Sequence, residues 1–346
     1  MKKAAVLGFS HWWRFAAFAG AFVCVLLSAE ATVPYQGPDG GYLNDPANWS
    51  GTFPTTDNLG FKDVPSSEYT VKLSDDLQTG GGIITDGESH TVHFDLAPYT
   101  FRALDSYKMS RLGVTHILES GTLELTKTTG ATNVVSFSSD TDTRNSTFIV
   151  RNPGTKLVGH ISMGHGYGNV ARIESGARVD GAIYVYAASN TAYVTGKGTV
   201  VDYHSAHNGK TGSNNTSYML VLGAHENRTG CERDCRMYIT DGAMVTNVTG
   251  LRIGAGLISD RAGIDNLLCV SNATLHITRT STGHVIGGMR PDAHGNRVEF
   301  IAGAQVTMGG SGSSHILDVG SEGAYSNSFY IAGAGTLVSN GWANGD

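Results

Sequence analysis

The residues best suited to bind a ligand lie in a long polar insertion between Val201 and Cys235. This segment combines imidazole, amide, ammonium and guanidinium groups, which can form hydrogen bonds or pair with anions. Loops that project from a regular scaffold commonly carry specificity. We therefore expect any binding site to use the following side chains of the insertion: His204, His207, Asn208, Lys210, His225 and Arg228.

Residues with the pattern of a catalytic site are not found. The triplet Gly164-His165-Gly166 resembles a short element of enzymes that hydrolyse galacturonan, but that chemistry also needs paired carboxylates close to the glycosidic oxygen. The adjacent pair Asp75 and Asp76 precedes the repeats, and no Cys and His residues have the spacing of a zinc site. The sequence therefore predicts no catalytic residues, no metal ligands and no cofactor, and we expect a protein without enzymatic activity.

Two cysteines of the insertion, Cys231 and Cys235, flank a short polar segment. In an exported protein they could form a local disulfide, although the small ring would be strained, and two free thiols are the alternative. Cys269 stands where other repeats carry Ile, Val or Phe, so we expect it to be a small buried apolar residue.

The elements that must position these residues are repeats. The stretch from Asn169 to Val179 returns in modified form at 190–200, 296–306 and 327–337. Each copy is an Asn, a short alternating apolar run, a tight Gly or Ala turn and a second apolar run. Intervals of roughly 21 to 45 residues, most of them typical of solenoids, separate the apolar anchors Ile117, Ile149, Ile173, Val194, Ile239, Cys269, Phe300 and Ile331.

Alternation within a copy predicts which side chains face the core. In the copy at 169–179, Ala171, Ile173 and Val179 should face inward, and Arg172, Glu174 and Arg178 outward. A third short strand that ends in Gly is expected at 161–164, 220–223, 251–254, 284–287 and 317–320.

The Asn that opens a copy is expected to be structural. Asn tolerates the left-handed backbone region and can bond to backbone groups nearby. We expect these residues to stack along one corner, with each amide satisfying the turn of its neighbour: Asn169, Asn190, Asn266, Asn296 and Asn327.

Composition supports the same fold class. The chain has 346 residues, of which 46 are Gly, 8 are Pro and 16% are charged, and its net charge is −6. We expect an all-β protein, a single-stranded parallel β-helix of right-handed sense, with an N-terminal cap. The predicted organisation is a signal peptide at 1–31, the cap and first strands at 32–110, and the repeats at 111–346. Because the chain stops at Asp346 directly after a copy, this expectation includes repeats that are truncated there.

The first residues predict export. Lys2, Lys3 and Arg14 precede an apolar run from Phe15 to Leu27, and Ala29-Glu30-Ala31 is a typical cleavage signal. The apolar run is short for a spanning helix, so we expect no membrane span after the signal is removed and a secreted or cell-surface location. Lys and Arg form no block, and nucleic acid is not an expected partner.

The repeats resemble a known group of proteins. The units at 173–179, 251–254 and 329–337 look like the passenger repeats of bacterial autotransporter-like and pectin-lyase-like β-helix proteins, and the segments 45–51 and 54–57 are similar to the start of such exported chains. The resemblance implies surface display with an adhesive or structural role, in contact with an extracellular glycan or a cell-surface protein. The alternative that it implies is a carbohydrate-active or carbohydrate-binding protein.

Overall fold

The computed structural model describes most of the chain after residue 31. The described residues are 32–50, 53, 56–61, 67–85, 89–105, 107–110, 112–126, 134–137, 143–203, 219–223, 232–255, 263–278, 284–288, 291–309, 317–320 and 323–340. The predicted signal peptide therefore lies outside them, and it stays a prediction.

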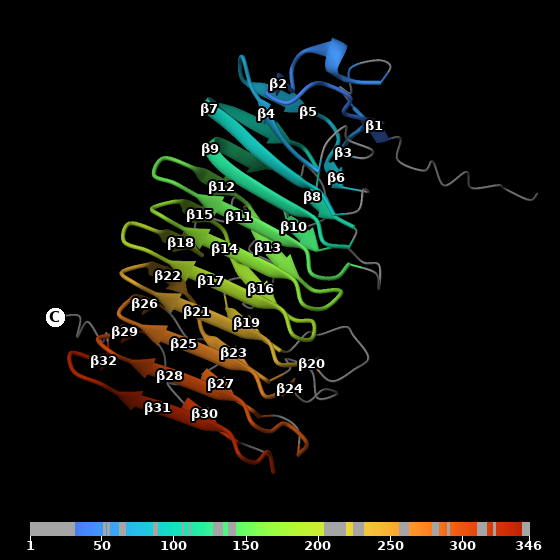
Figure 1. Cartoon of the computed structure of the whole chain (residues 1–346). Coiled ribbons are helices and arrows are strands. Elements are labelled where there is room, and N and C mark those ends of the chain that lie inside the picture. Colours follow the sequence, from blue (N-terminus) through green and yellow to red (C-terminus); the bar gives the residue numbers. More distant parts are fainter. Residues whose placement is uncertain are drawn as a thin grey trace, which may run out of the picture. The chain divides into compact units, whose positions relative to one another are not determined.

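Three ladders of parallel strands make up the fold, and each turn of the chain, a rung, adds one strand to each ladder (Figure 1). Ladder 1 contains β1 (Thr32–Pro34), β3 (Asn58–Phe61), β6 (Ile83–Thr85), β8 (Tyr107–Met109), β10 (Val134–Phe137), β13 (His160–Met163), β16 (Ile183–Val185), β19 (Leu220–Leu222), β23 (Leu251–Ile253), β27 (His284–Ile286) and β30 (Leu317–Val319). Ladder 2 contains β2 (Gly41–Tyr42), β4 (Glu68–Lys72), β7 (Thr91–Ala103), β9 (Thr115–Leu125), β11 (Thr147–Arg151), β14 (Val170–Glu174), β17 (Thr191–Thr195), β21 (Arg236–Thr240), β25 (Leu267–Ser271), β28 (Arg297–Ile301) and β31 (Ser328–Ala332).

Ladder 3 contains β5 (Leu77–Thr79), the second halves of β7 and β9, β12 (Lys156–Val158), β15 (Arg178–Asp180), β18 (Val200–Asp202), β22 (Met244–Val248), β26 (Thr274–Ile277), β29 (Gln305–Met308) and β32 (Leu337–Asn340). Outside the ladders, β20 (Glu232–Arg233) pairs with β24 (Gly263–Ile264), and η1 (Pro46–Asn48) is a short 3-10 helix. No α-helix occurs among the described residues. The all-β parallel β-helix that the sequence predicts is thus confirmed.

The register of ladder 2 shows how one copy of the repeat becomes one rung. Val170 pairs with Thr147 of the preceding rung and Thr191 of the following one. The polar insertion falls between the next two strands, since Thr191 pairs with Arg236. An insertion therefore lengthens one connection without shifting the pairing of the strands around it.

The predicted faces of the copy at 169–179 are confirmed. Ala171, Ile173 and Val179 are fully buried, whereas Arg172 and Glu174 are partly exposed. Their strand neighbours along the core repeat the same pattern, so the interior is a continuous column of apolar side chains. Burying one such aliphatic side chain contributes about 1.5–3 kcal/mol, which is available only when the next rung covers it.

Three of the predicted apolar anchors were placed one residue out of register. Ile117 pairs with Ile149, which pairs in turn with the outward residue Arg172. Cys269 pairs with Tyr238 and Glu299, which also face outward. All three anchors are therefore on the outer face. The inward residues of those rungs are their neighbours Leu118, Val150 and Val270. Cys269 is nevertheless buried, as expected. The reason for the error is that two adjacent apolar residues make the two faces of a strand equivalent in the sequence pattern.

Aromatic side chains close the N-terminal end of the core. Tyr35 packs edge-on against Trp49, with ring centroids 5.3 Å apart, and lies 5.9 Å from Phe61. The indole N–H of Trp49 donates to the carbonyl of Leu43 over 2.7 Å. The segment around η1 thereby supplies the side chains that cover the first rung, which is the role of an N-terminal cap.

The expected division at residue 110 is not a break in the ladders. Ile83 pairs with Tyr107, and Tyr107 pairs with Val135, so the strands of ladder 1 continue through this region. The sequence looked irregular here because β7 and β9 each run through a corner as one long strand. β7 has no Gly at this corner, and β9 has one, Gly121, with φ of 68°.

Candidate functional site on the outer face of ladder 2

The insertion that the sequence favours for binding lies outside the described residues. His204, His207, Asn208 and Lys210 belong to the segment 204–218, and His225, Arg228 and Cys231 to the segment 224–231. Their role in binding and a disulfide between Cys231 and Cys235 stay predictions.

Cys235 itself is described and lies at a buried corner of the core. Its thiol donates to the carbonyl of Ala187 over 3.0 Å, and its backbone N–H donates to Oδ1 of Asn266 over 2.9 Å. The residue therefore stands in the corner row that other rungs fill with Asn.

The five predicted corner Asn residues stack in this row, with Cys235 between Asn190 and Asn266. Each backbone N–H donates to the amide oxygen of the next rung: Ser146 to Asn169 at 3.0 Å, Asn169 to Asn190 at 2.8 Å, Cys235 to Asn266 at 2.9 Å, Asn266 to Asn296 at 3.3 Å and Asn296 to Asn327 at 3.0 Å. The side-chain N–H groups of Asn266 and Asn296 also donate to the next amide, over 2.8 and 2.9 Å. Asn169, Asn190, Asn266 and Asn296 are fully buried, so these bonds satisfy groups that water cannot reach.

The backbone at this corner differs from the sequence-based expectation. None of the five Asn residues has a positive φ; the residue before each of them does, with φ between 55° and 69° at Gly168, Ser189, Asp265, Gly295 and Ser326. The left-handed residue turns the chain, and the Asn that follows is left free to bridge rungs with its side chain.

Glycines that end the strands of ladder 1 make room for the same amides. Gly254 and Gly287 have φ of 64° and 59°, and a Cβ on either would overlap the carboxamide of Asn296 or Asn327. The recurrent Gly and the recurrent Asn are therefore two halves of one packing arrangement, and neither is available for chemistry.

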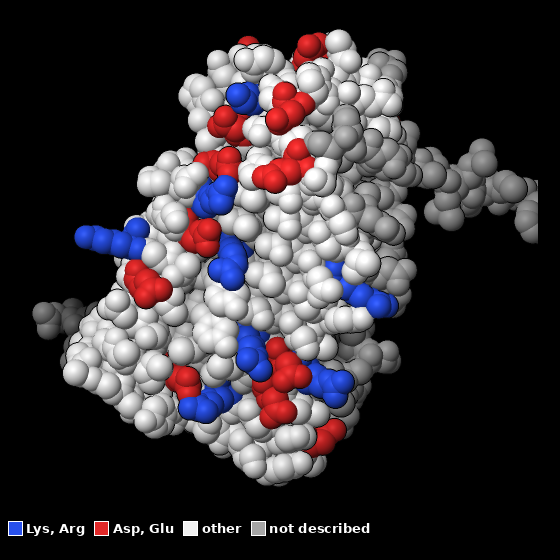
Figure 2. Space-filling model, in the orientation of Figure 1, with Lys and Arg blue, Asp and Glu red and all other residues white. Residues whose placement is uncertain are grey.

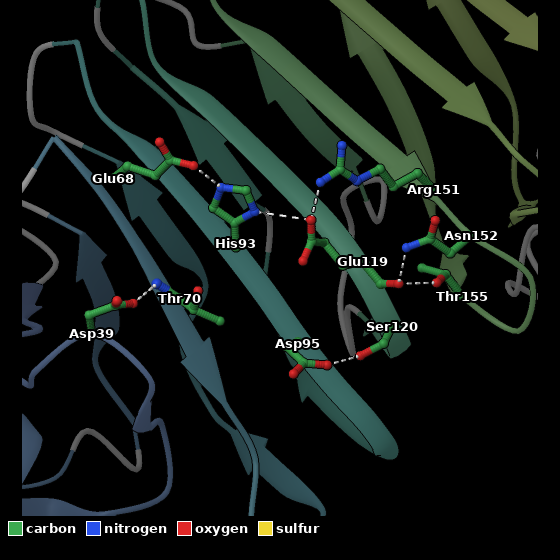
Figure 3. Close-up of polar contacts among 10 residues, drawn as sticks. All are labelled: Asp39, Glu68, Thr70, His93, Asp95, Glu119, Ser120, Arg151, Asn152 and Thr155. Carbon is green, nitrogen blue, oxygen red and sulfur yellow. Dashed lines mark hydrogen bonds and ion pairs between the residues drawn. The ribbon is translucent and has the colours of Figure 1, made fainter.

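Side chains that could act on a partner are instead found on the outer face of ladder 2. Four of them form an ion-pair chain across successive strands β4, β7, β9 and β11 (Figure 3). Nε2 of His93 lies 2.9 Å from Glu68, and Nδ1 lies 3.0 Å from Glu119. Arg151 pairs with the same oxygen of Glu119. We call these residues, Glu68, His93, Glu119 and Arg151, the ion-pair chain.

Glu119 is the centre of the chain. Partial burial raises the pKa of its carboxyl, but hydrogen bonds from Arg151 and His93 favour the charged form, and the net pKa is lower than usual. Glu119 is thus held as a carboxylate, with both contacts on its Oε1. A general acid for glycoside cleavage needs the opposite, a raised pKa, so this residue has the wrong protonation state for that role.

Backbone contacts hold the ion-pair chain in place. The carbonyl of Glu119 accepts from Asn152 Nδ2 over 3.0 Å and from Thr155 Oγ1 over 2.8 Å. Beside it, Ser120 Oγ donates to Asp95 over 2.5 Å (Figure 3). The carboxylates Glu68, Asp95 and Glu119 therefore lie on three neighbouring strands.

Sequence reasoning missed this set because the members are 25, 26 and 32 residues apart. One signal could have found them. Each of the four stands at the first, third or fifth position of its strand. In these strands the odd positions face outward.

Farther along the same face lies an uncharged set that we call the tyrosine patch: Tyr193, Thr195, Tyr238 and Thr240. The rings of Tyr193 and Tyr238 stack at 5.3 Å, and the guanidinium of Arg172 covers the other side of Tyr193 at 4.3 Å. The hydroxyls of Thr195 and Thr240 are 2.9 Å apart. Each of them also lies 2.9 Å from the same carboxylate oxygen, Oδ2 of Asp241. Stacking covers the ring faces, so the patch presents ring edges and hydroxyl groups.

Charge is unevenly distributed between the N-terminal rungs and the middle rungs. Residues 32–100 contain 10 Asp and Glu but 2 Lys and no Arg, whereas residues 144–200 contain 2 Asp and Glu and 6 Lys and Arg. In Figure 2, acidic side chains predominate over the N-terminal rungs, and an uncharged zone separates them from a second charged group.

Other classes of site leave no trace in the described part of the chain. Within it, no group of three or more His, Cys, Asp or Glu residues is arranged to hold a metal ion. None of the helices in the same residues has the length or apolarity to cross a bilayer.

Comparisons with protein-family models, with curated proteins and with solved structures gave no match to this chain.

Proposed function

We propose that this protein is an exported or surface-displayed β-solenoid with an adhesive or structural role, and that it contacts its partner through the outer face of ladder 2. The observation that carries the proposal is the tyrosine patch, a set of stacked rings and hydroxyl groups on a regular sheet face, in contact with Arg172 and Asp241.

The size of this face is suited to a macromolecular partner. Strands of about 16 Å, stacked about 4.8 Å apart from β4 to β31, give an area of roughly 700 Å². A partner in a standard protein interface contributes about 800 Å². One face of the solenoid is therefore large enough for an extended glycan or a protein surface.

The chemistry of the patch also favours recognition. Tyr offers a large contact area and a hydroxyl at low cost in conformational entropy, which is why it is common in binding surfaces. Here stacking with Arg172 fixes the rings before a partner arrives. The ion-pair chain adds little affinity because its groups already interact with one another. It can still exclude partners whose charges do not complement its own.

A binding experiment with the chain from Thr32 onward tests this proposal. The wild type would be screened on a glycan array and on immobilised cell-surface proteins, and then compared with a Tyr193→Ser, Tyr238→Ser double variant. We expect binding to fall at least tenfold in the double variant. Met244→Ser is the matched control, since Met244 is 42% exposed on ladder 3. A ligand that both variants bind as tightly as the wild type would refute the assignment to this face.

The three neighbouring carboxylates favour a second candidate, a carbohydrate-active protein. Glu68 has the most accessible carboxylate of the ion-pair chain, with 69% of its side chain exposed. Polysaccharides, acidic and neutral, would be incubated with the wild type and with Glu68→Gln, and new reducing ends would be measured. Cleavage that Glu68→Gln abolishes would replace the adhesive proposal, and no cleavage is expected.

A further inference from the structure

The interior of the N-terminal rungs contains two buried histidines in contact. His116 on β9 is fully buried, and His90, just before β7, is 4% exposed. Their ring centroids are 5.9 Å apart. His116 stands in the inward row between Val92 and Phe148, where every other rung from β4 to β31 carries an aliphatic or aromatic residue or Met.

Neutral groups surround the imidazole of His116. Its Nε2 lies 3.2 Å from the hydroxyl of Thr85 on β6, and its Nδ1 is hydrogen-bonded to the hydroxyl of Tyr107 on β8. Phe61 of β3 and Phe94 of β7 pack against the ring, with centroids at 6.1 and 5.6 Å. Tyr69 of β4 packs on His90 in turn, at 6.4 Å.

This surrounding disfavours a charge on the ring of His116. Burial is the larger of the two causes that lower the pKa of His116, and the neighbouring His90 is the smaller. Together they hold this pKa far below its usual value. Neither cause is a carboxylate, so a proton on His116 would gain no ion pair. Among the described residues nearby, Glu68 and Glu119 pair with His93 on the outer face of ladder 2.

We propose that the His90 and His116 pair is an acid-sensitive element that opens the rungs from β6 to β9 in mild acid, while the rungs from β14 onward stay closed. The sign follows from linkage. An unfolded His titrates near 6.5, so above that pH neither state binds a proton. Below it, His116 takes up a proton only in the opened state, and opening becomes more favourable as the pH falls. In a solenoid each rung contacts only its neighbours, and one part can therefore open without the rest.

Two further histidines, His160 and His284, are buried in later rungs, and His160 provides the clearer comparison. His160 of β13 is buried, and burial lowers its pKa to about 4. Its Nδ1 accepts from the N–H of Ala182 over 2.9 Å. It stands as a single residue beside Tyr184 at the sheet surface, so it serves as a built-in comparison for the pair.

Hydrogen exchange followed by mass spectrometry tests the proposal on the chain from Thr32 onward. Between pH 7.5 and pH 5.0, after correction for the intrinsic rate, we expect at least tenfold loss of protection in peptides from β7 and β9, and little change in peptides from β14 and β17. His116→Gln, alone and with His90→Gln, should remove this loss. His160→Gln, the matched control, should leave it unchanged.

Loss of protection that is uniform along the chain, or that persists in the double variant, would overturn the proposal. Should the His116 variants fail to fold, NMR titration of the wild-type histidines decides the matter. In the folded protein we expect His116 to stay neutral down to pH 5, and titration near 6.5 with the rungs intact would refute the proposed role.

Discussion

The N-terminal rungs and the rungs from β14 onward use different residues at the corner that precedes each strand of ladder 2. In the later rungs the corner row is Asn169, Asn190, Cys235, Asn266, Asn296 and Asn327, and amide oxygens join one rung to the next. In the earlier rungs the same row holds His90, Val114 and Ser146. The equivalence follows from the backbone, because Thr115 donates to His90 and Thr147 to Val114, just as Thr191 donates to Asn169.

The two regions also differ in the side chains that fill their cores. Rings of Tyr35, Phe61, Phe94, Tyr107 and His116 fill the N-terminal rungs, whereas Ala171, Ile173 and Val194 are typical of the later ones. In these N-terminal rungs β7 and β9 each run through a corner as one long strand. The comparison shows that one architecture tolerates two packing schemes, and that only the scheme with small residues and Asn leaves a visible repeat in the sequence.

The largest expected effect tests the aliphatic core of the later rungs. Ile173→Asp places a carboxylate where no water or partner reaches, and should lower the free energy of unfolding by about 4 kcal/mol or more. Glu174→Lys, on the neighbouring outward position, should change it by about 0.5 kcal/mol or less. Urea unfolding followed by circular dichroism measures both, and equal effects would refute the two-faced register.

The next effect tests the amide corner. Asn296→Ala removes the oxygen that accepts two N–H groups of Asn266, and leaves them buried without that partner. We expect a loss of about 2–3 kcal/mol in the free energy of unfolding. Asn152→Ala is the control, since this exposed turn Asn lies outside the row and should cost about 1 kcal/mol. A smaller effect for Asn296 than for Asn152 would contradict the bridging role.

A gain of stability is expected where the row is interrupted. Cys235→Asn would offer the N–H of Asn190 an amide oxygen like those of the other rungs, and should raise the free energy of unfolding by about 1 kcal/mol. Denaturant midpoints of the variant, the wild type and Cys235→Ala would be compared under reducing conditions. A Cys235→Asn protein less stable than Cys235→Ala would show that this corner cannot hold the amide.

The smallest effect concerns charge outside the N-terminal rungs. Glu119→Gln weakens the pairs with His93 and Arg151 and should cost about 0.5–1 kcal/mol at pH 7, given the partial exposure of all three side chains. Because the folded pKa of Glu119 is lowered, this stabilisation is complete above the unfolded value and is lost as the pH falls through the folded one.

The difference that Glu119→Gln makes should therefore shrink in acid, as measured by urea midpoints from pH 7 to pH 3 in the His90→Gln, His116→Gln background, in which β7 and β9 are expected to stay closed. Glu174→Gln serves as the comparison in the later rungs, since its pair with Arg172 spans 4.0 Å and is worth little. A cost for Glu119→Gln that does not depend on pH would mean that the residue acts through packing instead of charge.

The all-β solenoid, the short strands that end in Gly and the Asn that opens each copy could all be predicted from the sequence. These follow from local chemistry: alternation predicts strands, Gly allows positive φ, and a recurrent polar residue at a recurrent turn indicates a stacked corner. Where two apolar residues were adjacent, as at Ile149 and Val150, the same local rules could not tell the inner face from the outer.

Which side chains meet could not be predicted without the register of the strands in three dimensions. His93 touches Glu68 and Glu119 because the register of β4, β7 and β9 brings them side by side, although more than 20 residues separate them in sequence. His90 likewise became the counterpart of the corner Asn only when its rung was aligned with the others. In a solenoid, the length of each connection decides which residues of successive rungs lie side by side. Those lengths become clear only when whole rungs are packed on one another.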